Sequence, residues 1–299
     1  MVLFTSTRPL ERAENIKAVY DAYDGEKAFA RMNPYRQIPD LHSGKYRLQV
    51  TDELPSETVG KCLFIGHGMG VNKKYGLDQP HPYFNRPDLI TCAIASSKDI
   101  VHIVSKQCGI SESQVVVTGM PRTDAYFKRK KQPSEKRKYL YVPTFRAYKW
   151  WEPEWGSLNG HLNDDELFIA KPHMVTGKML NKTYSHIVEK DSMIPSADFI
   201  IDSDIVITDY SSIMYDAYIA RKPVVLFAKD RYKYLRQRGM YYPYPENYSE
   251  YFCDTEDSLI NTLRVAKWSN RAEEIRRFSV GACDGRATER VIELIGSMI

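Results

Sequence analysis

Residues 205–216, IVITDYSSIMYD, join an apolar run to a polar turn and then to a segment with helical spacing. A short apolar run of this kind is typical of a buried strand in a parallel sheet. The turn Tyr210-Ser211-Ser212 predicts a helix start, where backbone N–H groups attract phosphate and two hydroxyls add donors. The stretch therefore predicts an α/β fold that binds a phosphate group at this turn. Simple N-capping by Ser211 is the structural alternative.

Short apolar runs alternate with amphipathic segments along the rest of the chain, which indicates mostly parallel strands. Ligands in such sheets bind outside the carboxyl ends of the strands. The predicted strands are residues 2–5, 61–65, 89–94, 114–117, 139–142, 168–170, 205–208 and 224–227. The predicted helices are residues 10–23, 97–107 (capped by Ser96 or Ser97), 212–220, 230–238, 255–268, 271–278 and 287–298.

The length of the chain, 299 residues, favours two domains. The polar run KRKKQPSEKRK at 128–138 is interpreted as the linker between two Rossmann-like lobes, residues 1–132 and 133–299, with a cleft between them. The final helix either closes the second lobe or packs back on the first. A basic patch facing an anionic membrane or a polyphosphate is the alternative reading of the linker.

The composition is that of a globular protein, with 43% hydrophobic and 27% charged residues. A net charge of +4 suits a protein that handles phosphates but is too small to indicate nucleic-acid binding. Five cysteines without a CxxC pair predict reduced thiols and no zinc site. No apolar signal sequence begins the chain and no window reaches about 18 apolar residues, so a cytoplasmic protein is expected. Any membrane contact would be peripheral, at the inner face.

Two histidines follow predicted strands. In residues 64–70, FIGHGMG, a strand delivers His67 into a glycine-rich turn, where an imidazole has the pKa to accept a proton from a hydroxyl. In residues 170–174, AKPHM, Lys171 and His173 are candidates to neutralise a diphosphate leaving group. A structural role is the alternative for each, and no Walker sequence is present.

Two arginines also follow predicted strands. Arg122 lies in TGMPRTD, residues 118–124, and Arg146 lies with Thr144 in VPTFR, residues 142–146. Arginine is a natural bidentate partner for phosphate, and an internal ion pair is the alternative. Asp209 is expected to orient its turn or a ribose hydroxyl. The DxD-like triplet at residues 202–204 is expected to flank a strand and to bind no metal.

Taken in order, these segments resemble the CDP-glycerol glycerophosphotransferase family of teichoic-acid primases and polymerases. The match covers roughly residues 60–299, and seven modest pieces in the right order make it specific. The matching pieces are His67-Gly68, the GMPRTD and PTFR segments at 119–124 and 143–146, Lys171-Pro172-His173, TDYSS with Asp216, Lys222-Pro223 with Tyr234 and Arg238-Gly239, and Asp284–Ala287 with Arg290.

The resemblance implies a GT-B fold, with an acceptor-side lobe over 1–132 and a donor lobe over 133–299. It implies a CDP-alcohol donor, no metal and no cofactor beyond that donor. His67 is then the base on the acceptor hydroxyl and His173 the contact to the donor phosphates. The donor-binding residues that follow from the motifs are Arg122, Thr144, Arg146, Lys171, Thr208, Asp209, Ser211, Ser212 and Asp216.

Departures from the family pattern fall on the acceptor side. Only about 60 residues precede the HG strand, which predicts a trimmed first lobe, and Gly66, Met69 and Gly70 replace the usual neighbours of HG. The acceptor is therefore left as a hydroxyl on a polymer, a glycan or a base. Three alternatives stay open: a GT-B glycosyltransferase that uses a nucleotide sugar on a glycan or a hydroxylated DNA base, a nucleotide-sugar 2-epimerase, and a non-catalytic nucleotide-binding partner of surface-polymer assembly.

Overall fold

A computed structural model describes residues 1–33, 38, 41–55, 57–68, 72–74, 87–146, 152–173 and 175–299. The described residues form two compact units, residues 1–125 with 277–299 and residues 126–276. The division falls between residues 125 and 126, earlier in the chain than the expected boundary at 132. Met69, Gly70 and Met174 of the expected motifs lie outside the described residues.

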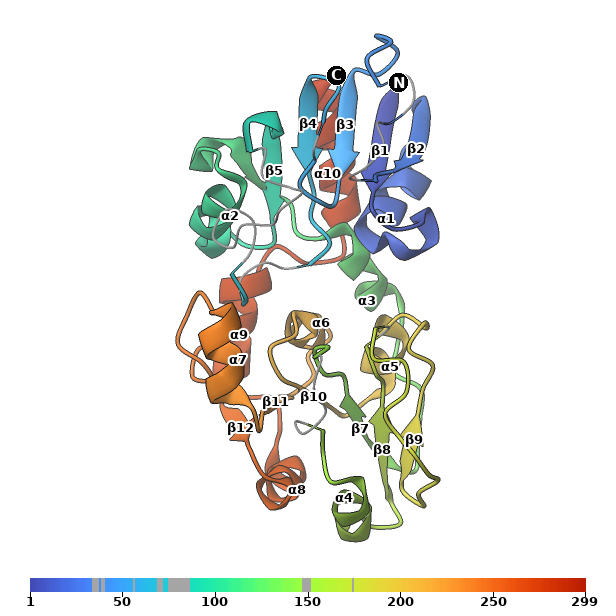
Figure 1. The fold of residues 1–299 in the computed structure, drawn as a ribbon, viewed down its shortest axis with the longest axis vertical. Helices are drawn as coiled ribbons and strands as arrows, with labels where there is room; N and C mark the ends of the chain where they lie inside the picture. The colour runs from blue at the N-terminus through green and yellow to red at the C-terminus, as the bar shows by residue number, and fades with distance from the viewer. Residues whose placement is uncertain are drawn as a thin grey trace. The chain divides into compact units, whose positions relative to one another are not determined.

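The first unit contains a six-stranded parallel sheet in the order β2-β1-β3-β4-β5-β6 (Figure 1). Its strands are β1 (Val2–Ser6), β2 (Lys27–Arg31), β3 (Leu48–Thr51), β4 (Lys61–Phe64), β5 (Cys92–Ala95) and β6 (Val115–Val117). The strand order reverses between β1 and β3, so the topological switch point lies there. Ligands of open α/β sheets bind at the carboxyl ends of the strands at such a point.

Most helices of the first unit begin without a side-chain cap. They are α1 (Glu14–Ala22), α2 (Val101–Cys108) and α10 (Ala287–Met298). The last residues of α9 (Asn270–Val280), from Arg277 on, also belong to this unit. The Ser97 hydroxyl accepts a hydrogen bond from the backbone of Asp99, at the start of the short 3-10 helix that leads into α2. The predicted cap at Ser96 or Ser97 is thereby confirmed.

Helix α10 belongs to the first unit, and the two motifs GMPRTD and DGRATER hold it there. The carboxylate of Asp124 accepts hydrogen bonds from the backbone N–H groups of Ala287 and Thr288 at 3.0 and 2.8 Å. Gly119 has φ +80, and a Cβ at this position would lie 2.5 Å from the carbonyl oxygen of Ala282. Only glycine fits both demands, so this motif residue serves the packing of the chain's last segment.

The second unit contains another six-stranded parallel sheet, in the order β12-β11-β10-β7-β8-β9 (Figure 1). Its strands are β7 (Arg137–Tyr141), β8 (Glu166–Ala170), β9 (Ile187–Glu189), β10 (Ile205–Thr208), β11 (Val224–Phe227) and β12 (Tyr251–Cys253). Here the order reverses between β7 and β10. The second switch point is therefore at the ends of these two strands.

The remaining helices belong to the second unit in whole or in large part. They are α3 (Ala125–Lys128), α4 (Trp155–His161), α5 (Ala197–Asp202), α6 (Ile213–Ile219), α7 (Arg231–Arg238) and α8 (Glu256–Val265). Aromatic rings fill the core on one side of the sheet, where Tyr141 lies 6.1 Å from Trp155 and 6.3 Å from Phe227 between ring centroids. Because β10 and β11 are buried along their whole length, their near-continuous apolar sequence follows from burial on both faces.

The expected α/β class with two Rossmann-like lobes is confirmed, and each predicted strand and helix has a counterpart. Strands β10 and β11 and helix α10 have the predicted bounds. The predicted strand 89–94 is shorter, because residues 87–89 form a 3-10 helix before β5 begins. Strands β2, β3, β9 and β12, the short helix at residues 125–128 and the helices at residues 155–161 and 197–202 were not predicted. All five cysteines are free and buried.

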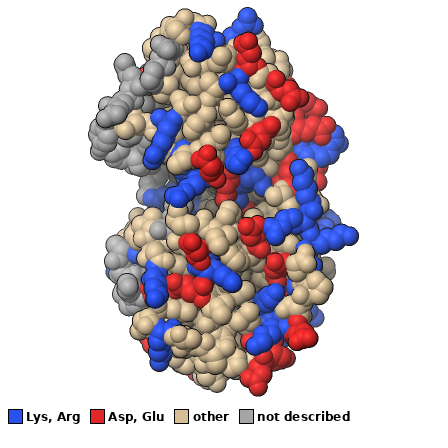
Figure 2. Space-filling model, turned by 90° about the vertical axis from the view of Figure 1, so that its right-hand side faces the viewer, with Lys and Arg blue, Asp and Glu red and all other residues tan. Residues whose placement is uncertain are grey.

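The charged run at 128–138, which was interpreted as a linker, lies within the second unit, and its last residues belong to β7. Arg129 and Lys131 form ion pairs with Asp198 and Asp204, and the backbone of Lys138 donates to Asp204 at 2.9 Å. On the face drawn in Figure 2, basic side chains are interspersed with acidic ones. Among the described residues no helix combines the length and the apolar character needed to cross a membrane.

Candidate functional site

The turn that carries His67 follows β4, at the carboxyl edge of the first sheet. Gly66 has φ +60, and its carbonyl oxygen accepts a hydrogen bond from Asn15 Nδ2 at 2.8 Å. Asn15 is 1% exposed, and its Oδ1 accepts from the backbone N–H of Arg122 at 3.0 Å. One buried amide on α1 therefore sets the positions of both the His67 turn and the Arg122 turn.

The imidazole of His67 is one-third exposed and faces two acceptors with one nitrogen. Its Nδ1 lies 3.3 Å from Glu53 Oε1 and 3.4 Å from the backbone carbonyl oxygen of Asp52. Since a carboxylate and a carbonyl only accept, we assign the proton of the neutral ring to Nδ1. Nε2 then carries the lone pair, which is the arrangement that a general base requires.

Charged groups around His67 set its protonation. Burial lowers the pKa of His67 from its usual value, Glu53 opposes this shift, and Arg8 and Arg122 add to it. The guanidinium of Arg8 lies 4.0 Å from Glu53, and that of Arg122 lies 3.6 Å from Glu14. The imidazole is therefore neutral at neutral pH and able to accept a proton.

Asp52 is a buried carboxyl at the end of β3, next to this histidine. It is 1% exposed, and its Oδ2 accepts a hydrogen bond from Ser6 at 3.1 Å. Its other oxygen has no hydrogen-bond partner among the described residues. Burial and the nearby charge of Glu53 raise the pKa of Asp52 to about 7. Such a shift at a switch point marks a candidate functional site.

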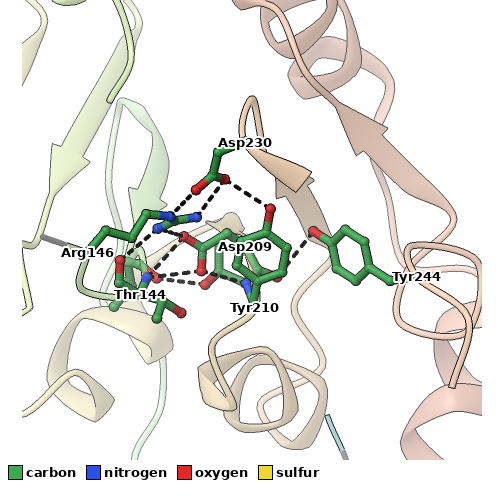
Figure 3. Close-up of polar contacts among 8 residues, drawn as sticks. Thr144, Arg146, Asp209, Tyr210, Asp230 and Tyr244 are labelled. Carbon is green, nitrogen blue, oxygen red and sulfur yellow. Dashed lines mark hydrogen bonds and ion pairs between the residues drawn. The ribbon is translucent and has the colours of Figure 1, made fainter. Parts of the chain in front are cut away.

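At the second switch point the residues after β7 and β10 form one polar network (Figure 3). Both carboxylate oxygens of Asp209 accept from the backbone N–H of Thr144, at 2.9 and 3.0 Å. The same carboxylate accepts from the backbone of Tyr210 at 2.5 Å and from Arg146 at 2.8 Å. Thr208 is buried, and its hydroxyl donates to Val142 at 2.6 Å. This motif thus ties the ends of β7 and β10 together.

Arg146 lies at the centre of that network, with only 2% of its side chain exposed. It forms an ion pair with Asp230 as well as with Asp209, and Asp230 accepts from the Tyr210 hydroxyl at 2.9 Å (Figure 3). The rings of Tyr210 and Tyr234 stack at 3.8 Å beside the guanidinium. Burial lowers the pKa of Arg146, but the two carboxylates outweigh it and hold the pKa above its ordinary value.

This burial favours the structural alternative for Arg146, while its contact with a donor stays a prediction. Its guanidinium donates to Asp209, Asp230 and the Thr144 carbonyl, which is the internal ion pair named as the alternative. Asp216 is also buried, and it accepts from the Tyr126 hydroxyl at 3.1 Å. These buried side chains support the turn at the start of α6 rather than facing solvent beside it.

The two serines of the turn differ from their neighbours because they are only half-buried. The Ser211 hydroxyl accepts from the backbone of Ile213 at 3.4 Å, so the predicted N-capping role is present in weak form. Ser212 is the N-cap residue of α6 and makes no side-chain capping bond. Both hydroxyls therefore sit at the second switch point on positions that solvent reaches.

His173 is exposed and follows β8. Its Nδ1 accepts from the backbone N–H of Val175 at 3.2 Å, which assigns the proton of the neutral ring to Nε2. The ring lies 6.2 Å from that of Phe145, and Lys171 Nζ donates to the carbonyl of Ser192 at 3.3 Å. The Nε2 atom of His173 is thus an N–H donor, whereas the Nε2 atom of His67 carries a lone pair.

The sequence-predicted residues divide between the two units. His67 and Arg122 lie in the first unit, and the other predicted residues lie in the second. Sequence reasoning placed Arg122 with the donor set, whereas the structure places it in the same unit as His67. It missed Arg8, Asp52, Glu53 and Asp230. Asp52 and Glu53 could have been found from their place directly after β3, but that strand was not predicted either. No cluster of His, Cys, Asp or Glu suited to hold a metal occurs among the described residues.

Comparisons with known proteins point in one direction. The model of the family CDP-Glycerol:Poly(glycerophosphate) glycerophosphotransferase matches residues 46–297. The chain is 25% identical to a teichoic acid poly(ribitol-phosphate) polymerase of Bacillus spizizenii, over 77% of this chain and 42% of the relative. It is also 25% identical to a teichoic acid glycerol-phosphate primase of Bacillus subtilis, over 84% of this chain and 71% of the relative. The chain thus spans less than half of the first relative and about seven-tenths of the second.

Solved structures agree on the fold. The wall teichoic acid polymerase TagF superposes with a TM-score of 0.81 at 18% identity, over 99% of this chain and 88% of that chain. A UDP-N-acetylglucosamine 2-epimerase superposes with a TM-score of 0.61 at 12% identity, over 98% and 94% of the two chains. The expected GT-B architecture is confirmed by these likenesses.

Proposed function

The chain belongs to the CDP-glycerol:poly(glycerophosphate) glycerophosphotransferase family, and on this premise we propose that it is an enzyme that transfers a phosphoalcohol from a CDP-linked donor to an acceptor hydroxyl. The observation that carries the proposal is the partly exposed His67, whose Nδ1 faces two acceptors and whose Nε2 is the basic nitrogen. Relatives are named for both glycerol phosphate and ribitol phosphate, so either alcohol is a candidate.

The donor phosphates are assigned to the second unit. The hydroxyls of Ser211 and Ser212 and the Nε2–H group of His173 supply hydrogen-bond donors, and Lys171 supplies positive charge near the end of β8. Arg146 and Asp209 act as positioning residues that keep the Thr144 and Tyr210 backbones in place. Donors held in place before the reaction stabilise the developing charge of the leaving group without reorganisation.

The reaction is an in-line displacement at phosphorus. The acceptor oxygen forms a bond to the phosphorus of the transferred group, and the bond from that phosphorus to the bridging oxygen of CMP breaks. The acceptor's proton passes to Nε2 of His67, which becomes an imidazolium and later loses the proton to water. CMP leaves with its negative charge. No atom changes oxidation state, so the step needs no redox cofactor.

Release of CMP tests the proposal directly. The protein would be mixed with CDP-glycerol, CDP-ribitol or UDP-N-acetylglucosamine, each with a glycerol-phosphate oligomer as acceptor. We expect acceptor-dependent CMP release from a CDP-alcohol, together with thermal stabilisation by that donor. Release of UDP without CMP would instead indicate glycosyl transfer, and conversion of the UDP-sugar into its epimer would indicate epimerase chemistry. Binding of nucleotide without any turnover would indicate a non-catalytic partner of polymer assembly.

A further inference from the structure

A second acidic residue of the first switch point faces His67 directly. We propose that Glu53 is a positioning residue for His67: its carboxylate keeps the imidazole proton on Nδ1, so that Nε2 is the nitrogen that takes the acceptor's proton. This inference rests on the proposed function and adds a residue to it. It follows from the distances and burial of the two side chains.

The two atoms nearest to Nδ1 of His67 make this nitrogen a hydrogen-bond donor. Glu53 Oε1 lies 3.3 Å from Nδ1, and the Asp52 carbonyl oxygen lies 3.4 Å from the same atom. Neither partner can donate, so a proton on Nδ1 satisfies both and a proton on Nε2 satisfies neither. The orientation of a histidine by a carboxylate on its second nitrogen is a recurrent device in proton transfer.

The backbone of Glu53 is held in position by the end of β3. The Thr51 hydroxyl accepts from the backbone N–H of Glu53 at 3.3 Å and donates to its carbonyl oxygen at 2.8 Å. Thr51 is fully buried, and the Glu53 side chain is 15% exposed against 34% for His67. A mostly buried carboxylate on an anchored backbone loses little further conformational freedom when it orients a ring.

The charges that face the ring give Glu53 a second effect. Arg8, after β1, and Arg122, in the turn after β6, both disfavour the imidazolium, whereas Glu53 favours it. Asp52, buried beside them, is only partly ionised near neutrality because burial raises its pKa to about 7. Glu53 is therefore the group that stabilises His67 once it has accepted the proton.

The test replaces Glu53 and follows both the rate and the tautomer. In Glu53→Gln an amide of similar size takes the place of the carboxylate, and its N–H can drive the ring proton to Nε2. We expect kcat for CMP release to fall by about 10²-fold with KM changed less than about 3-fold. The acid limb of the pH–rate profile should move to lower pH, because Glu53 raises the pKa of His67 in the wild type. Glu53→Asp should recover part of the rate.

A matched control separates this effect from the loss of any carboxylate in the segment. Glu57, four residues on, is half-buried and accepts from the backbone of Ile38 at 2.9 Å. Glu57→Gln should leave kcat and the acid limb as in the wild type. A Glu53→Gln rate within about 2-fold of the wild type, with an unmoved acid limb, would overturn the inference.

Nitrogen NMR of the imidazoles separates this inference from the proposed function. Among the seven histidines, the signals of His67 can be assigned by comparison with His67→Gln. We expect the Nδ1–H form for His67 in the wild type and a mixture of forms in Glu53→Gln. If the wild type releases no CMP from any donor, the proposed function fails while this readout still judges Glu53. An Nε2–H ring in the wild type would overturn the inference whatever the activity.

Discussion

The two switch points of the molecule use charge in opposite ways. At the second, Arg146, Asp209 and Asp230 are almost wholly buried and paired with one another. At the first, Arg8, Glu53 and His67 remain 39%, 15% and 34% exposed, and the contacts among them are longer. The same place in the same kind of sheet therefore carries a closed ion-pair network in one unit and an open, titratable group in the other.

The difference indicates a division of labour. A buried arginine with two carboxylates cannot change its protonation near neutral pH, so it suits the support of a binding turn. A partly exposed imidazole with a lowered pKa is neutral and can gain a proton, so it suits proton transfer. The comparison predicts that substitutions at the first switch point change rates and pH dependence, and that substitutions at the second change stability.

The largest effect is expected at His67. His67→Ala should reduce CMP release by about 10²–10⁴-fold, because the general base is lost, while donor affinity changes little. Steady-state rates and thermal shifts with CDP-glycerol would measure the two quantities. His102→Ala, an exposed histidine on α2, is the control and should match the wild type. Normal turnover in His67→Ala would remove the contrast between the two switch points.

Arg146 should show a large effect of the other kind. Arg146→Met leaves Asp209 and Asp230 buried without their cation, which costs about 3–5 kcal/mol of unfolding free energy. Urea unfolding would measure it. Stability close to the wild type would mean that the network does not support the second unit, and the proposed division of labour would fail.

Asp52 should give a smaller, pH-dependent effect. Burial raises its pKa from 3.8 to about 7, so stability that is present at low pH is lost as the pH rises toward that value. Asp52→Asn carries no charge at any pH. It should therefore be more stable than the wild type at pH 8, by about 4 kcal/mol at most, with a smaller difference at pH 5. An equal difference at both pH values in denaturant unfolding would contradict the raised pKa.

The smallest effect is expected at an exposed ion pair of the second unit. Arg129 pairs with Asp198, and both side chains are 47% exposed. Arg129→Met should change the unfolding free energy by about 1 kcal/mol or less, because water screens the pair. The same substitution at Arg146 removes a buried cation that pairs with two carboxylates, so the two variants together compare a buried ion-pair network with an exposed pair. A loss at Arg129 as large as at Arg146 would show that burial is not the cause.

Sequence patterns predicted strands well where the strand is apolar throughout and poorly elsewhere. Strands β10 and β11 were predicted with their observed bounds because every residue is buried on both faces. Strand β3 escaped because its buried Gln49 interrupts the apolar run; in the structure Gln49 donates to the Thr5 hydroxyl at 3.1 Å. Since β3 was missed, Asp52 and Glu53 could not be placed at a sheet edge.

Residue types at the site were also easier to predict than their roles. His67 and the TDYSS turn lie at the carboxyl ends of strands, as predicted. Arg146 was predicted to meet a phosphate, because its partner Asp230 lies 84 residues further along the chain and no local pattern links them. An arginine that binds a ligand and one that closes an internal ion pair look alike until long-range contacts are known.

The place of α10 has a consequence for biosynthesis. Residues 126–276 are contiguous, so the ribosome completes the second unit before it makes α10, whereas the first unit stays unfinished until that helix is available. Until α10 is made, the carboxylate of Asp124 lacks the backbone N–H groups of Ala287 and Thr288 that donate to it in the folded protein. The second unit should therefore become protease-resistant on the nascent chain first, although it is encoded later. Limited proteolysis of stalled chains that end before residue 287 would test this order. If the first unit is already protease-resistant in these chains, it folds without α10 and the expectation is wrong.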